Sequence, residues 1–439
     1  MKSFVISVGL LVILMAGGLR IFSNNWNPIA SDGFGYYLYL PQILKYQNVT
    51  GEEMWSHFDK NDTLNAEGRL IELDNGNYLN KYPIGEAILM LPFFLLADVS
   101  NTVLFQQSNY FDGVYSFFML VSVIFYLIVG IYFLSKSLLK FFNKKIAFLT
   151  LVVLILGTNL LHYATYDATF SHIYSFCILS IFTYLILSFE KLKNKNLYWV
   201  GLGLFYGLAV AIRQTNLIIG LLLFIPFLQL LKELKLIQVF RKYFFKFLIF
   251  TLIAALAFLP QMIYWYLVSS KLFVFSYLGE SFNFLNLEIL NVLFSARKGL
   301  FFWSPLLLLS IAGFVIGFKK KQKELVVMGS IVLIQLIVIS GWWAWSYGYS
   351  FGHRAFTEFL VLFAFPLGFF VEWILSKKSR VLKIFAAVVI SVLILLNLFQ
   401  MQQYWRGLLN PDGMTIESYQ KIFLQPCTSL IPALRCDWL

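Results

Sequence analysis

Eleven apolar stretches, each close to the length that crosses a bilayer as a helix, dominate this sequence. A helix needs about 20 apolar residues to cross about 30 Å of hydrocarbon. Charged residues make up only 13% of the 439 positions, about half of their share in a soluble domain. The sequence therefore predicts an all-α polytopic membrane protein with about 11 transmembrane helices. The stretches are read at residues 4–22, 113–135, 146–164, 170–189, 199–215, 217–231, 247–268, 300–318, 325–341, 359–376 and 382–401.

A further apolar stretch, Ile84–Ala97, is shorter than these. It has about fourteen residues and contains Pro92, which suits an interfacial or re-entrant helix better than a span. Counting it as a span would also place several lysine clusters on the opposite side of the membrane. We therefore expect this helix to lie at the membrane surface.

The short loops between alternate stretches are rich in lysine and arginine. Because basic residues are retained on the cytoplasmic side, the N-terminus is predicted inside and the C-terminus outside. The first helix is then a retained signal anchor, since a cleavage site is only weakly indicated after it. The net charge of +12 reflects this topology and does not favour nucleic acid as a partner. Twenty-one of the 34 basic residues fall at Lys2 and within residues 136–145, 191–195, 232–246, 319–323 and 377–383, whereas only four of the 22 acidic residues lie on or near that side, namely Glu190, Glu233, Glu324 and Glu372.

The polar residues on the predicted outer side form loops and a tail rather than a separate domain. Residues 1–401 are predicted to form one transmembrane domain that includes the outer loop 23–112, and residues 402–439 a short outer tail. The first loop has too few apolar residues for its own core, so we expect short juxtamembrane helices there. Within it, Glu67–Tyr78 predicts a small hairpin that turns at an Asn-Gly pair. In the tail, Cys427 and Cys436 are expected to pair in an oxidising compartment, with two free thiols as the alternative.

Asp32 follows the first apolar stretch and stands among aromatic residues. A carboxylate placed where a membrane helix meets water is costly unless it has a partner or a task. Asp32 is suited to cap a helix that begins near Gly33, either as its whole role or together with a function. Tyr36 would lie about one helical turn away and join the same site.

Cations recur near the predicted outer ends of the stretches. Lys81 precedes Pro83, where a helix can begin, so its ammonium is expected beside a helix N-terminus that suits phosphate. The alternative for Lys81 is a snorkelling surface side chain. Arg213 ends its stretch and needs an anionic partner, for which Asp167, Asp32 and a ligand phosphate are the candidates.

Two later segments add cations and aromatic rings. Arg297 and Lys298 stand just before an apolar stretch, on the side where cations are disfavoured, which favours anion binding. Trp345, His353 and Arg354 lie in a segment rich in glycine and aromatic residues. An aromatic belt explains the rings but not the cations, whereas an arginine can grip a phosphate through two donors. Together these residues suit an anionic lipid head group.

The predicted outer connection at residues 162–172 contains candidate metal ligands. His162, Asp167 and His172 are candidate ligands of a divalent ion, yet their five-residue spacings match no standard zinc pattern. A hydrogen-bonded turn is therefore favoured there, and no certain cofactor is predicted.

In this order, the clusters resemble those of the GT-C fold polytopic glycosyltransferases, the group that contains protein mannosyltransferases and lipid A aminoarabinose transferases. In that family an Asp follows the first helix and a Lys-Pro-Pro or His-Pro-Pro element comes later in the same loop. Asp32 matches the first, and Lys81-Tyr82-Pro83 is similar to the second. Residues 203–216 are similar to the family's Gly-Leu…Arg-Pro-Thr stretch, and residues 297–305 and 350–358 look like segments of uncharacterised bacterial members.

The resemblance implies transfer of a sugar from a polyprenyl-phosphate donor to a glycan, lipid or protein acceptor at the outer face of a bacterial cytoplasmic membrane. Asp32 is then the base of an inverting displacement. The Asp-Glu pair of the mannosyltransferases is absent, because Gly33 follows Asp32, which leaves the donor sugar and any metal dependence open. The expected substrate-binding residues are Tyr36, Lys81, Arg213, Arg297, Lys298, Trp345, His353 and Arg354.

Two other functions are weighed against this one. A glycan polymerase or ligase also uses outer arginines and a lipid-linked substrate, but a long outer loop late in the chain would favour it, and the longest loop here is the first. A lipid-linked glycan flippase or transporter would place its charges at mid-membrane on broken, often repeated helices. The charges of this chain gather near one side, and no repeat is visible.

Overall fold

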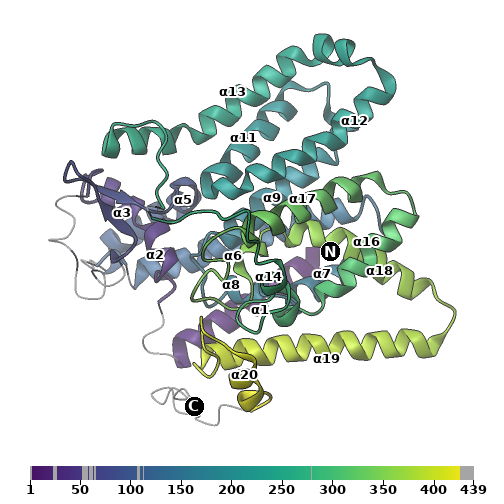
Figure 1. Ribbon diagram of the computed structural model, residues 1–439. Helices are drawn as coiled ribbons and strands as arrows, with labels where there is room; N and C mark the ends of the chain where they lie inside the picture. The colour runs from purple at the N-terminus through teal and green to yellow at the C-terminus, as the bar shows by residue number, and fades with distance from the viewer. Residues whose placement is uncertain are drawn as a thin grey trace.

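Apolar helices make up most of the computed structural model, which describes residues 2–22, 27–51, 58, 63, 66–105, 109–111, 113–277 and 279–425 (Figure 1). The prediction of an all-α membrane protein is confirmed in this part of the chain, whereas the number and direction of the spans stay predictions. Six helices are long and apolar enough to cross a membrane: Gly85–Phe105, Val114–Leu138, Gln214–Glu233, Leu236–Ser269, Lys323–Ser340 and Arg380–Trp405. Five shorter apolar helices are Ser7–Gly18, His172–Ile186, Asn196–Ile212, Leu307–Lys319 and Leu360–Ser376.

Each predicted apolar stretch coincides with helix in the structure. Two of the helices are capped at their starts by polar side chains, since Asn143 accepts a hydrogen bond from the Ile146 N–H and Ser379 accepts one from the Leu382 N–H. In chain order the stretches correspond to α1 (Lys2–Phe22), α6 (Val114–Leu138), α7 (Lys144–Leu156) with α8 (Leu160–Tyr163), α9 (His172–Ile186), α11 (Asn196–Ile212), η3 (Gln214–Leu223) with α12 (Phe224–Glu233), α13 (Leu236–Ser269), α15 (Leu300–Trp303) with α16 (Leu307–Lys319), α17 (Lys323–Ser340), α18 (Leu360–Ser376) and α19 (Arg380–Trp405).

The helix expected at Ile84–Ala97 is longer than predicted. It runs as α5 (Gly85–Ser100) and continues into the π-helical turn η2 (Asn101–Phe105), so that it is long and apolar enough to cross a membrane. The length argument against a span is therefore wrong, because the helix continues past Asp98, where the apolar run ends. α5 lies antiparallel to α6, as Tyr126 donates to the Leu89 carbonyl and Tyr115 to Asp98.

The segment that follows α11 has an unusual helical geometry. η3 is a 3-10 helix of ten residues, whereas such runs rarely exceed 3–4 residues. Arg213 precedes it in an extended conformation. Arg213 therefore lies at a sharp break between two apolar helices.

The first polar loop contains the predicted short elements. α2 (Asp32–Tyr37) and α3 (Tyr39–Leu44) precede a hairpin of β1 (Leu70–Glu72) and β2 (Tyr78–Asn80), whose register pairs Ile71 with Leu79. Gly76 supplies the left-handed turn conformation, with φ of 81°. The side-chain amides of Asn75 and Asn77 donate to the Val268 carbonyl. The hairpin thereby caps the end of α13.

The long helices lie in groups, with short helices between and after them. Figure 1 shows α11, α12 and α13 side by side on one flank and α19 along the opposite edge. Gln403 donates to the carbonyls of Ile422 and Gln425, so the described part of the tail folds back onto α19. Cys427 and Cys436 lie outside the described residues. The remaining short helices are α10 (Phe189–Leu192), α14 (Ile289–Phe294), η4 (Arg354–Phe356) and α20 (Ile416–Ile422).

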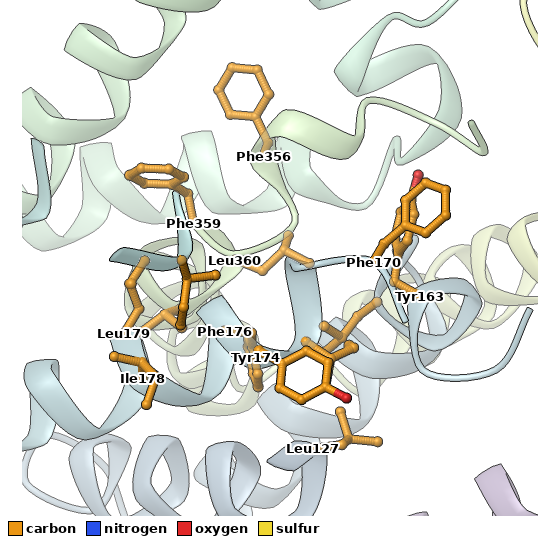
Figure 2. Packing of buried hydrophobic residues seen from close by; sticks show 14 of the residues in the cluster. Leu127, Tyr163, Phe170, Tyr174, Phe176, Ile178, Leu179, Phe356, Phe359 and Leu360 are labelled. Carbon is orange, nitrogen blue, oxygen red and sulfur yellow. The ribbon is translucent and has the colours of Figure 1, made fainter. Parts of the chain in front are cut away.

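Buried side chains from distant segments fill the centre of the bundle. Figure 2 shows Tyr174 and Phe176 of α9 packed near Leu127 of α6, with Phe359 and Leu360 from the start of α18 close by. The hydroxyl of Tyr174 is satisfied by Ser122 at 3.1 Å. This packing fixes the start of α9 and the start of α18, which both border the site described below.

Replacement of Gly313 by alanine should destabilise the bundle. A Cβ at Gly313 of α16 would lie 1.8 Å from the Pro366 carbonyl oxygen of α18, and overpacking of this kind costs about 1–3 kcal/mol. We expect a lower thermal midpoint for G313A in detergent, measured by the loss of monodisperse protein on size-exclusion chromatography. Gly17 of α1 has no atom near the Cβ position, so G17A should keep or raise the midpoint. Equal midpoints for the two variants would contradict the α16–α18 contact.

Candidate functional site

Asp32 begins α2 and makes two strong contacts across the fold. Its Oδ2 lies 2.6 Å from Nη1 of Arg354, and its Oδ1 accepts a hydrogen bond from the Tyr82 hydroxyl at 2.7 Å. Arg354 is 322 positions away in the sequence, on η4. A second cation is close to Asp32. Nη2 of Arg69, in the hairpin, lies 3.4 Å from the Ser31 hydroxyl, and Arg69 acts electrostatically on Asp32.

The carboxylate of Asp32 is held in its ionised form. Burial raises the pKa of Asp32, but the Arg354 guanidinium and the Tyr82 hydrogen bond outweigh that effect and hold the pKa below its ordinary value. The side chain of Asp32 keeps 20% of its surface exposed, so an incoming molecule can reach it. The structure therefore joins Asp32 and Arg354, two of the predicted site residues, in one ion pair.

The glycines that follow Asp32 are required by close packing. A Cβ at Gly33 would lie 1.9 Å from the Thr169 hydroxyl, and one at Gly35 would lie 2.3 Å from the Tyr82 ring. A larger residue would push α2 away from the segment before α9 and from Tyr82. The absence of an acidic residue at position 33 therefore has a steric cause in this chain.

A second ion pair lies beside the first. Nε of Arg213 is 3.0 Å from Oε1 of Glu358, and Nδ1 of His172 is 2.8 Å from Oε2 of the same carboxylate. Glu358 is completely buried, yet Arg213 and His172 overcome the effect of burial and lower its pKa. Arg213 also donates to Ser171, whose hydroxyl donates to Tyr36 at 3.1 Å. Tyr36 and Arg213 thus belong to one network, and the anionic partner of Arg213 is Glu358 rather than Asp167 or Asp32.

Lys81 adjoins this network but has an anionic partner of its own. Its ammonium pairs with Glu280 and lies 4.8 Å from the centre of the Tyr277 ring. The ring of the next residue, Tyr82, packs at a tilt against the Tyr36 ring, with the ring centres 4.7 Å apart. Lys81 is therefore at the edge of the site, and a phosphate there would compete with Glu280.

Arg297 and Lys298 lie next to the tail instead. The Arg297 guanidinium binds Asp412 at 3.1 Å and covers the Trp345 ring at 5.8 Å. The Lys298 ammonium, only 2% exposed, donates to the carbonyls of Ser350 and Pro411. Burial lowers the pKa of Lys298 to about 7. Lys298 therefore ties the loop that leads to Arg354 to the tail, and Arg297 and Trp345 form an exposed cluster of their own.

His353 is buried directly before Arg354. Among the described residues, neither of its imidazole nitrogens has a hydrogen-bond partner. The ring packs edge-on against Phe356 at 5.1 Å. Burial, reinforced by Lys298 and Arg354, lowers the pKa of His353 to about 3, so the side chain is neutral at physiological pH.

The three candidate metal ligands do not come together. His162 lies 2.8 Å from Asp167 through Nε2 and accepts a hydrogen bond from Trp405 through Nδ1, whereas His172 pairs with Glu358. Within the described residues no group of three His, Cys, Asp or Glu side chains is placed to hold a metal. The hydrogen-bonded turn favoured from the sequence is what the structure contains at His162 and Asp167.

Four contributors to the site were not predicted as site residues. Tyr82 and Glu358 stand inside segments singled out in the sequence, and Glu358 follows Arg354 by four positions, so a search for the anionic partner of Arg213 could have included it. Arg69 and Tyr277 carry no local signal, because only the folding of the hairpin and of the segment after α13 brings them near Asp32.

Comparisons of the chain with protein-family models, curated proteins and solved structures find no match. The chemistry of the site therefore has to be judged from its own residues. Two guanidinium groups, two carboxylates and several tyrosine hydroxyls meet at one end of the apolar helices. Guanidinium groups are suited to pair with an anion, and an ionised carboxylate is suited to accept a proton.

Removal of the Lys298 side-chain amine should be costly, whereas the neighbouring cation should matter little for stability. In K298M the buried carbonyl of Ser350 would lose its partner, a loss of about 1–3 kcal/mol. R297M removes a pair that is 42% exposed on the arginine side, so little change is expected. Thermal midpoints of both variants in detergent test this contrast, and a K298M midpoint equal to that of R297M would refute the buried tie.

Proposed function

We propose that this protein is a membrane glycosyltransferase that moves a sugar from a polyprenyl-phosphate donor to an acceptor. The observation that carries the proposal is the pairing of Asp32 with Arg354 beside a second ion pair, Arg213 with Glu358. A carboxylate for the acceptor and guanidinium groups for the phosphate stand side by side. The resemblance of the same segments to GT-C fold transferases supports this assignment.

The residues fit the demands of the reaction. The acceptor hydroxyl attacks the anomeric carbon, the bond from that carbon to the phosphate oxygen breaks, and the hydroxyl proton passes to Asp32. A phosphate monoester is already a weak base, so its departure needs little help from an acid. Arg354 and Arg213 would stabilise the charge that gathers on the phosphate.

The Asp32–Arg354 contact gives the donor a second effect on catalysis. While Arg354 holds Asp32, the carboxylate is a weak base because its pKa is depressed. A donor phosphate that takes over Arg354 would weaken this restraint. Asp32 would then gain basicity only when the donor is bound, which limits unproductive activation of water.

The topology proposed from the charges fits this activity. We propose eleven spans, an N-terminus inside and a C-terminus outside, in the cytoplasmic membrane of a bacterium. α5 is not counted among them, because counting it would move several lysine clusters to the outside. The lysines at the end of α6 and the start of α7 lie at the helix ends opposite to the site, since Tyr37 of α2 donates to the Tyr110 carbonyl, just before the start of α6. The site would then face outward, where a glycan, a lipid or a protein serves as acceptor.

Asp32→Asn should abolish transfer without loss of the fold. The amide keeps the shape of the side chain but accepts no proton at the pH of the reaction. The measurement is turnover in liposomes with a polyprenyl-phosphate sugar, together with the thermal midpoint of the variant. Near-normal turnover in a well-folded D32N protein would remove Asp32 from its proposed role.

Arg354→Lys should weaken donor use more than Arg297→Lys. A lysine cannot replace the two-donor contact of a guanidinium, and Arg354 lies on Asp32, whereas Arg297 lies on Asp412. We expect a donor KM raised about tenfold or more in R354K, the equivalent of about 1.4 kcal/mol, and little change in R297K. The reverse order would shift the phosphate site to the Arg297 cluster.

The pH dependence of kcat/KM should show no acid limb from Asp32 across the physiological range. Because Arg354 and Tyr82 hold the pKa of Asp32 below its ordinary value, the base of the free enzyme stays ionised throughout this range. Tyr82→Phe removes a hydrogen bond that stabilises the carboxylate, so its acid limb should move to higher pH. A limb that does not move in Y82F would contradict the role of this hydrogen bond.

A further inference from the structure

The segment after α13 exposes many large apolar side chains, while Ser276 and Glu280 bond inward to the hairpin end. We call residues 271–277 and 279–294 the strap. On its inner side, the buried Ser276 hydroxyl donates to the Lys81 carbonyl at 2.7 Å, and Glu280 pairs with the Lys81 ammonium. Its exposed large apolar residues are Leu272, Phe273, Phe275, Phe282, Phe284, Leu285, Leu290 and Phe294.

Polar residues of the strap such as Lys271, Ser281, Asn283 and Asn286 are exposed as well, but so many exposed large apolar residues in one short segment are unusual for a surface in water. A segment that lies over a protein in water buries its apolar side chains and exposes its polar ones. Leu285 is instead 95% exposed and Leu290 74% exposed, while Glu280 is engaged by Lys81 and Trp343. The outer side of the strap is therefore suited to an apolar environment.

The strap is continuous with surfaces that face lipid. It leaves the end of α13 and is bound to the end of α17, where the N–H groups of Asn283 and Glu288 donate to the carbonyls of Gly341 and Ser340. Large apolar residues stay exposed along both helices, among them Leu256 on α13 and Leu333 on α17. Both helices are long and apolar enough to cross a membrane.

From these exposed apolar residues and this continuity we infer that the strap lies at the edge of the bilayer, with its apolar side chains among the lipid chains and its exposed polar ones toward the head groups, at the end of the bundle that holds the site. The occupant of this surface is lipid rather than a second copy of the chain, because the surface prolongs the flanks of two membrane helices. The aromatic rings of Phe273, Phe282 and Phe284 suit the depth at which apolar side chains meet the head groups.

The strap then forms the wall between lipid and the polar site. Tyr277 lies on its inner side against Lys81, within electrostatic reach of Asp32 and Arg213. A lipid-borne molecule in the same leaflet would reach the arginines past this single layer of chain. The inference about the strap holds whether or not the site transfers a sugar.

Spin labels on the full-length protein in nanodiscs of phosphatidylethanolamine and phosphatidylglycerol test this inference. Nitroxides would be attached at Leu285→Cys and at Leu290→Cys, in a background with Cys427 and Cys436 replaced by serine; Cys177 is buried. Leu285 is almost fully exposed, so the label disturbs no packing. Leu256→Cys on α13 serves as the reference for lipid, and Asp74→Cys on the hairpin turn as the reference for water.

At both strap positions we expect collisions with oxygen to exceed those with a water-soluble nickel complex several-fold, as at position 256. Nickel access equal to that at position 74 would place the strap in water and overturn the inference. Spin–spin broadening that disappears on dilution with unlabelled protein would assign the surface to a second copy, and would overturn it as well.

Discussion

Charges drawn into an apolar helical bundle must be neutralised by partners, and these partnerships determine how the ends of the helices meet. Asp32 with Arg354, and Arg213 with Glu358, join the first polar loop, the end of α11 and the segment before α18. Isolated charges in such surroundings are strongly disfavoured. The same pairs that permit burial therefore also align the groups on which chemistry would depend.

Sequence patterns predicted the parts of this structure that depend on neighbouring residues in the chain. The apolar stretches predict the helices because hydropathy alone decides which residues leave water. The Asn75–Gly76 pair predicts the hairpin because few dipeptides adopt that turn. Asp32, Arg213 and Arg354 stood out because charged residues at the predicted outer ends of the apolar stretches need a partner or a function.

Sequence patterns did not predict contacts between residues that are far apart in the chain. Nothing near Lys298 indicates that its ammonium would be enclosed by the carbonyls of Ser350 and Pro411, so a residue expected to bind phosphate serves instead as a tie. Lys81 likewise pairs with Glu280, and Arg297 with Asp412, and both acidic partners come from segments far away in the sequence. The length of α5 was underestimated for a different reason, since helix formation continued past the last residue of the apolar run.

The ten-residue 3-10 helix η3 changes how far a short apolar segment reaches. A 3-10 helix rises about 2.0 Å per residue, against about 1.5 Å for an α-helix. Gln214–Glu233 has 20 residues, half in each form, and so extends about 35 Å, where an α-helix of the same length would extend about 30 Å. In the proposed topology Arg213 lies at one membrane surface and Lys232 near the other, and the greater rise of η3 lets a short apolar segment cover more of the distance between them.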